Sequence, residues 1–110
     1  MRRVLGFALF TVFTFITART AIADSNGTIT QIAVIGDVVF FTAGSHTGKP
    51  TCSTIGDEWA FSLTTPGGRG MYALLLTAQL RGLPVTVNGS GSCPAWGDRE
   101  APLSISMFPA

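Results

Sequence analysis

Five short segments of strand-type sequence surround one segment of helical type, and this order constrains the fold more than any other feature. Residues 28–35 are rich in β-branched side chains and run into a Gly36-Asp37 turn. Residues 38–42 then return as the second strand of a predicted hairpin. The remaining strand-type segments are 59–63, 84–88 and 101–107.

Apolar residues recur at helical spacing between the third and fourth of these segments. The apolar positions of residues 71–81 form two adjacent rows, Tyr72, Leu76 and Leu80 in one and Met71, Leu74, Leu75 and Ala78 in the other. Gly82 and Pro84 end the predicted helix, and the Pro- and Gly-containing segment 64–68 is expected to be a break before it. So wide an apolar face predicts a helix that is central to its own core or shared with a second subunit.

Three strands, a helix and two strands is the element order of the OB-fold. This fold is a five-stranded, partly open barrel with a helix between strands three and four. An open sheet covered by one helix is the competing α+β arrangement. We favour the barrel because closure leaves a small domain with few exposed strand edges.

The first 23 residues have the composition of an export signal. Residues 1–23 open with two arginines, continue through an apolar run at 4–16, and end with small residues at Ala21 and Ala23. An N-terminal helix of the fold is an alternative, and so is a retained anchor, although the run is shorter than a span of roughly 20 residues. We therefore predict cleavage after Ala23, an OB-fold domain at 24–110, and a secreted or periplasmic protein.

The two cysteines, Cys52 and Cys93, both lie in the predicted mature domain. Export to an oxidising compartment makes a disulfide between them the expected state. We expect no metal site and no cofactor, because His46 is the only histidine and the chain has no CxxC motif.

Charge argues against polyanionic partners. The predicted export signal, residues 1–23, holds three of the seven lysines and arginines and no acidic residue. Its removal therefore changes the net charge of the 110-residue chain from +1 to −2. Nucleic acids and anionic lipid surfaces require clustered cations, and the four that remain are scattered along the chain. We expect no nucleic-acid partner and no membrane span.

Candidate catalytic residues are few. His46 lies in a turn-rich loop and is expected to face solvent, as are the acid pairs Asp57-Glu58 and Asp98/Glu100. A small hydrolase that uses these groups is a remote alternative, and we expect no enzyme. Trp59 is expected in the core, whereas Trp96 on its loop is either a lid over the barrel or a ring that stacks on a sugar.

Several short motifs follow one another in an order that resembles a known family. They are Gly27-x-Ile29-x-x-Ile32, Phe40-Phe41, Cys52, Trp59-x-Phe61, Tyr72-Ala73-x-Leu75-Leu76-x-Ala78, Gly82-x-x-Val85-x-Val87-x-Gly89-x-Gly91-x-Cys93 and Glu100. Over nearly all of residues 24–110 the chain resembles the B subunit of subtilase cytotoxin and its small exported bacterial relatives. These motifs are structural rather than catalytic, so they bear on fold more than on activity.

The resemblance implies an OB-fold that assembles into a homo-oligomeric ring, binds sialylated cell-surface glycans and accompanies a toxic A subunit. Ser25 stands where a serine of the toxin subunit contacts the sugar. With Asn26 as an amide partner and Lys49 as a cation for a carboxylate, it forms the predicted ligand-binding site. The alternative is a monomeric periplasmic OB-fold protein that binds a protein partner.

Overall fold

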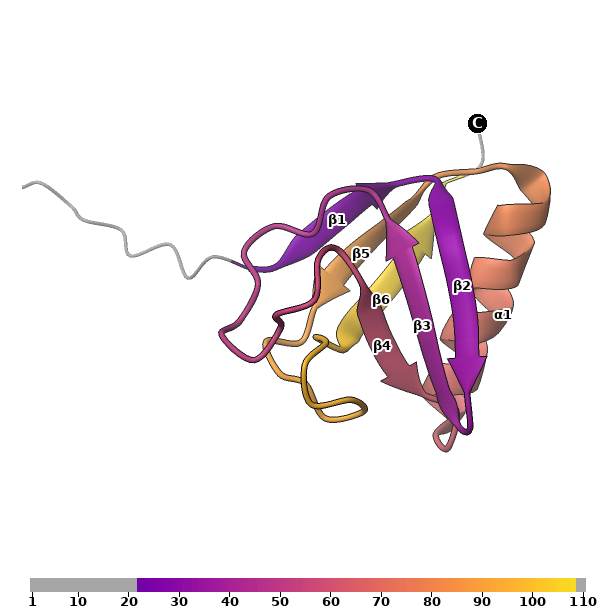
Figure 1. Ribbon diagram of the computed structural model, residues 1–110. Helices are drawn as coiled ribbons and strands as arrows, with labels where there is room; N and C mark the ends of the chain where they lie inside the picture. Colours follow the sequence, from indigo (N-terminus) through magenta and orange to yellow (C-terminus); the bar gives the residue numbers. More distant parts are fainter. Residues whose placement is uncertain (1–21, 109–110) are drawn as a thin grey trace, which may run out of the picture.

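The computed structural model describes residues 22–108, which form six β strands and one α helix. The elements are β1 (Asp24–Gly27), β2 (Ile29–Ile35), β3 (Val38–Ala43), β4 (Trp59–Ser62), α1 (Pro66–Arg81), β5 (Val85–Gly89) and β6 (Pro102–Met107). They build two three-stranded antiparallel sheets, ordered β1-β5-β6 and β2-β3-β4 (Figure 1). The predicted signal segment lies outside the described residues except for its last two positions.

The predicted hairpin is confirmed, but the first strand is longer than expected and divided. β2 pairs with β3 across the Gly36-Asp37 turn, with Ile35 opposite Val38. Upstream of it, β1 begins at Asp24 and pairs with β5 in the other sheet. The chain therefore crosses from one sheet to the other around Thr28, where the strand is interrupted and bends (Figure 1).

The core fills the space between the two sheets. It is built by inward-facing residues of the strands, by two residues of the helix and by the residue that precedes β1: Ala23, Val39, Phe41, Ala43, Trp59, Phe61, Leu75, Ala78, Val85, Val87 and Ile105. On the side opposite the β1–β2 bend, the sheets approach each other where the Ala60 N–H donates to the Glu100 carbonyl oxygen at 3.1 Å. Trp59 is fully buried, as predicted.

The helix begins five residues earlier than predicted, at Pro66 rather than Met71. Thr65 caps it, because its hydroxyl accepts a 3.0 Å hydrogen bond from the Gly68 N–H, and proline suits the first helical position. Gly68 packs so closely on β4 that any Cβ there would overlap the Ser62 carbonyl oxygen. The glycines that suggested a break are therefore part of the first helical turns.

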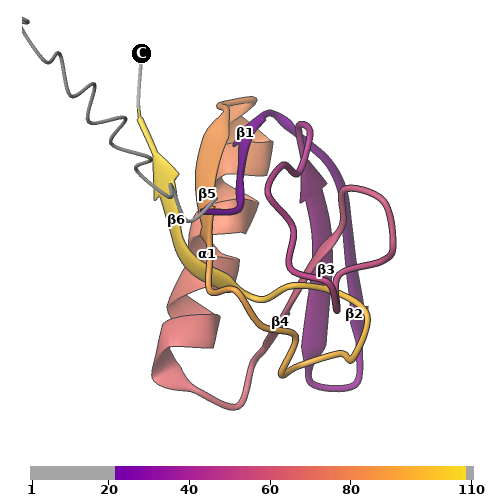
Figure 2. The same cartoon turned by 90° about the vertical axis from the view of Figure 1, so that its left-hand side faces the viewer.

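The end of the helix is as predicted, with Gly82 in the left-handed conformation at φ 63°. α1 packs against β6, β2 and β4, and Figure 2 shows it behind β5 and β6. Leu75 and Ala78 are buried, whereas Leu76 is 37% and Leu80 89% exposed. The row of Met71, Leu74, Leu75 and Ala78 thus packs on the core, whereas only Tyr72 of the other row does so. No helix among residues 22–108 is long and apolar enough to cross a membrane.

Candidate functional site

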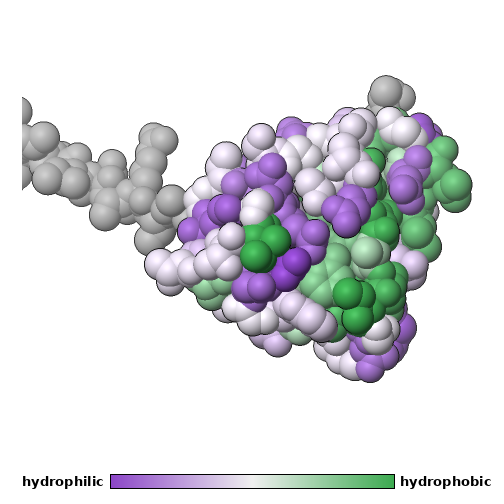
Figure 3. Space-filling model, in the orientation of Figure 1, coloured by the Kyte–Doolittle hydropathy of each residue, from purple (hydrophilic) through white to green (hydrophobic). Residues whose placement is uncertain are grey.

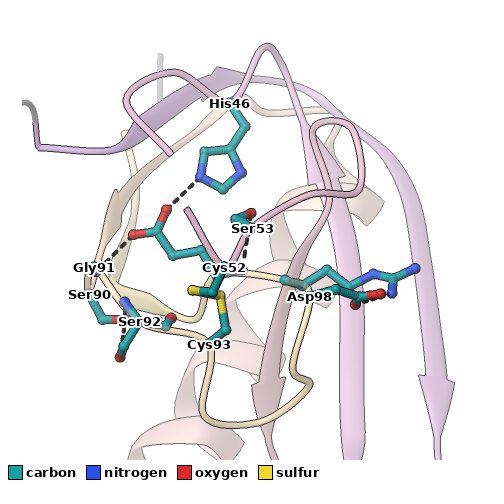
Figure 4. The surroundings of a disulfide bond; sticks show 10 residues. His46, Cys52, Ser53, Ser90, Gly91, Ser92, Cys93 and Asp98 are labelled. Carbon is teal, nitrogen blue, oxygen red and sulfur yellow. Dashed lines mark hydrogen bonds and ion pairs between the residues drawn. A yellow bond between two sulfur atoms is a disulfide. The ribbon is translucent and has the colours of Figure 1, made fainter. Parts of the chain in front are cut away.

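The predicted disulfide is present and ties two long loops together. Cys52 lies in the loop between β3 and β4, and Cys93 lies in the loop between β5 and β6 (Figure 4). Their Cα atoms are 6.2 Å apart. Each loop also supplies one member of a buried polar pair, so the disulfide joins the two segments that build this pair.

His46 and Glu100 form that pair, with His46 Nε2 2.7 Å from Glu100 Oε1 and both side chains fully buried. The second carboxylate oxygen accepts a 2.8 Å hydrogen bond from the Gly91 N–H. The prediction that both side chains face solvent was wrong. The two residues lie 54 positions apart in the sequence, and the β3–β4 and β5–β6 loops bring them together. Figure 4 shows the hydrogen bond that His46 forms.

The pair belongs to a longer network that reaches the core. The His46 ring stacks on the Trp59 indole, with centroids 3.6 Å apart and planes 13° from parallel. The Trp59 Nε1–H in turn donates to the Ser25 hydroxyl at 3.0 Å. The His46 Nδ1 atom is buried without a hydrogen-bond partner among the described residues. A substrate cannot reach the imidazole in this conformation, because no part of the side chain is exposed.

The predicted ligand-binding residues do not come together. Ser25 is 2% exposed, and its hydroxyl is occupied by Trp59 inside the fold. Asn26, the next residue of β1, points outward and is exposed. Lys49 is also exposed, and its ammonium donates to the Gly56 carbonyl oxygen at 2.8 Å. Ser25 is thus an internal acceptor for the core tryptophan rather than a surface group.

A second arrangement of polar and aromatic groups lies on the outer face of the β2-β3-β4 sheet. Phe40 faces outward there, yet it is only 3% exposed because the loop that follows Cys93 folds over it. The Trp96 ring meets Phe40 edge-on at 5.0 Å between centroids, and the Arg99 guanidinium lies 5.2 Å from the centroid of the same ring. We call the adjoining hollow of about 250 Å³ the aromatic pocket; it is lined by Gln31, Ala33, Ile35, Phe40, Glu58, Trp96 and Arg99.

A tight turn presents Trp96 and Arg99 to this pocket together. The Arg99 N–H donates to the Trp96 carbonyl oxygen at 3.1 Å, and Trp96 remains 40% exposed. Figure 3 shows apolar surface over β2 and β3, where Val34 and Ile35 are also exposed. The pocket therefore combines an accessible aromatic ring with polar groups from β2 (Gln31) and from two loops (Glu58 and Arg99).

Arg99 is held by two carboxylates at the edge of the pocket. Its Nε lies 2.8 Å from Glu58 Oε1, and its terminal nitrogen contacts the Asp98 carboxylate. Partial burial by itself lowers the pKa of Arg99, but the hydrogen bonds and charges of Asp98 and Glu58 outweigh it and raise this pKa. The guanidinium therefore stays charged, and these three side chains carry a net charge of −1.

Residues 22–108 contain no group of three or more His, Cys, Asp or Glu side chains that could hold a metal ion. No family model matches the chain, and no curated protein or solved structure matches it.

Proposed function

We propose that the protein is an exported, non-enzymatic carbohydrate-binding domain of the OB-fold class. The strand arrangement supports the barrel. The β1–β2 segment contributes to both sheets, and the Ala60–Glu100 hydrogen bond joins their other edges. The strands then run in the order expected of a partly open barrel, with α1 between β4 and β5.

The observation that carries the proposal is the exposed Trp96 ring beside fixed polar groups. A sugar presents an apolar C–H face flanked by hydroxyls, and small-ligand sites combine aromatic walls with a few placed polar groups. Trp96 supplies the apolar face, while Gln31, Glu58 and Arg99 offer donors and acceptors. The edge-on contact with Phe40 fixes the ring, so little rotamer entropy is lost when a ligand binds.

The charges of the aromatic pocket favour a neutral sugar. Its one cation, Arg99, is already paired with Glu58 and Asp98. A sialic acid carboxylate would meet two like charges there, and like charges at an interface are unfavourable. Hydroxyl groups can instead donate to the carboxylates and accept from the guanidinium. We therefore propose neutral hexoses as ligands in place of the sialylated glycans that the family resemblance implied.

Replacing Trp96 by alanine is expected to weaken sugar binding about tenfold, which corresponds to about 1.4 kcal/mol, because the apolar platform is lost. A glycan array identifies the neutral ligand, and calorimetric titration then compares wild type with Trp96→Ala. Leu103→Ala is the matched control, since Leu103 is an exposed apolar residue that does not line the aromatic pocket. A silent array, a preference for sialylated glycans, or unchanged affinity in Trp96→Ala would contradict the proposal.

The exposed helix residues support self-association. Leu76 and Leu80 form an unburied apolar row on α1, and oligomer interfaces cover patches of this kind. We propose a homo-oligomer packed through α1, with Thr77 and Arg81 toward its centre. Several weak sugar sites on one assembly would then act together through their effective concentration.

Sedimentation at micromolar concentration is expected to give a multiple of the chain mass for wild type and a single chain for Leu80→Glu. Leu80 is chosen because a charge at this exposed site disturbs an interface without entering the core. Leu103→Glu serves as the control and is expected to leave the mass unchanged. A monomeric wild type would contradict self-association, but it would leave the proposal of sugar binding at the aromatic pocket unaffected.

A further inference from the structure

The residue after which cleavage is predicted lies inside the fold. Ala23 is 4% exposed and belongs to the hydrophobic core. Its carbonyl oxygen accepts a 2.7 Å hydrogen bond from the Gly89 N–H. Cleavage after Ala23 would therefore remove a packed side chain and a backbone acceptor, and would leave a new chain end at that place.

Glu100 lies directly beside this position. A Cβ placed on Gly89 would be 2.8 Å from the Ala23 Cβ and 2.8 Å from the Glu100 Cδ, and closer still to Glu100 Oε2. The Ala23 methyl group and the Glu100 carboxyl carbon are therefore no farther apart than twice that distance. Removing Ala23 would bring the new chain end into the immediate surroundings of the buried carboxylate.

Glu100 has hydrogen-bond partners in the described part of the chain, but none of them is a permanently charged cation. Its partners are His46 Nε2 and the Gly91 N–H, and the ion pairs of residues 22–108 give it no lysine or arginine. A proton on His46 Nδ1 would have no acceptor, because that atom is buried without a partner. Nε2 is therefore the one ring nitrogen of His46 that has a hydrogen-bond partner among the described residues. A buried carboxylate without a cation is strongly unfavourable.

We propose that cleavage between Ala23 and Asp24 supplies Glu100 with a cationic partner, namely the α-ammonium group of Asp24. Hydrolysis of this peptide bond adds one water, so that Ala23 leaves with a carboxylate and Asp24 gains an amino group that is protonated at neutral pH. This inference rests on the predicted export signal and is independent of sugar binding. The processed chain end then forms an ion pair with Glu100 in the space that Ala23 vacates.

The backbone holds Asp24 at the edge of that space. The Asp24 N–H donates to the Thr47 carbonyl oxygen at 3.1 Å, and the Thr47 N–H donates back to Asp24 at 2.9 Å. After cleavage the ammonium group has three protons, so it keeps the bond to Thr47 and has two left for Glu100. The hollow that Ile22 and Ala23 line together with residues 48–50 and 89–91 gives the new chain end room to move toward Glu100.

The test is the pKa of the α-amino group in protein that begins at Asp24, measured by NMR on ¹⁵N-labelled material. We expect a value at least about one pH unit above the 7.7–8.0 of ordinary chain ends, because Glu100 stabilises the charged form. The other ionisable groups around this site are His46, Lys49, Asp57 and the Asp24 side chain itself. Asp24→Asn separates the effect of the residue's own carboxylate from that of Glu100.

Two controls make the result specific to the ion pair. In protein that retains Ile22 and Ala23, the amine lies two residues farther out and is expected to have an ordinary pKa. In Glu100→Gln protein that begins at Asp24, the raised pKa is expected to return to the ordinary range. If Glu100→Gln does not fold, wild type and the longer form decide the question. An ordinary pKa in the Asp24 form, or exported protein that begins at another residue, would overturn the proposal.

Discussion

Replacing Glu100 by alanine is expected to lower the free energy of unfolding by about 3–5 kcal/mol, because it leaves buried hydrogen-bond donors without an acceptor and opens a cavity. The side chain is fully buried, and both of its oxygens are engaged. Without it, the His46 Nε2 and the Gly91 N–H lose their partner inside the fold. A cavity of carboxylate size adds to the loss.

Urea denaturation of the purified variant measures this effect. Asp98→Ala is the control, because Asp98 is the other acid of the same loop and its side chain is 42% exposed. Its removal is expected to change the free energy of unfolding by less than about 1 kcal/mol, as for most surface ion pairs. If Glu100→Ala and Asp98→Ala had the same free energy of unfolding, the buried His46–Glu100 pair would not contribute more to stability than a surface carboxylate.

Much of the fold could be predicted because its signals are local. The Gly36-Asp37 turn between two β-branched segments defines the β2–β3 hairpin, and Gly82 followed by Pro84 defines the end of α1. The disulfide also follows directly, since two cysteines allow only one intrachain bond. Each of these features depends on neighbouring residues or on a count, and needs no knowledge of long-range packing.

The parts that escaped prediction depend on contacts between distant segments. β1 has the sequence Asp-Ser-Asn-Gly, which has little strand propensity, and it is a strand because it pairs with β5. In that register Ser25 lies opposite Val87, and both side chains face the core. We expected Ser25 to face solvent, but it lies on the inner face of β1. The residue types alone do not reveal which face of the strand it occupies.

The candidate sites likewise have parts that local sequence predicts and parts that depend on contacts between distant segments. Trp96 could be recognised as a ring on a loop, and the structure confirms that it is partly exposed. Its companions Gln31, Glu58 and Arg99 come from three separate segments that only the folded sheet brings together. His46 and Glu100 are a harder case, because a lone histidine in a glycine-rich loop has no periodic pattern that would indicate burial.

Removing the disulfide by the double substitution Cys52→Ala and Cys93→Ala is expected to lower the free energy of unfolding by about 2–5 kcal/mol. The bond closes a loop over 41 positions, and the chain-entropy estimate for this length is about 4 kcal/mol. In this domain it also ties the loop that holds His46 to the loop that holds Glu100. Loss of the bond is therefore expected to loosen the buried pair.

The same substitution is expected to weaken sugar binding, because the Trp96–Arg99 turn follows Cys93 by three residues. Denaturation curves with and without a thiol reductant measure the contribution of the bond. The reductant should lower the midpoint of wild type toward that of the double variant and should leave the variant unchanged, which separates the bond from the alanine side chains. Two reactive thiols in native exported protein would refute the disulfide, as would a wild-type midpoint that does not respond to the reductant.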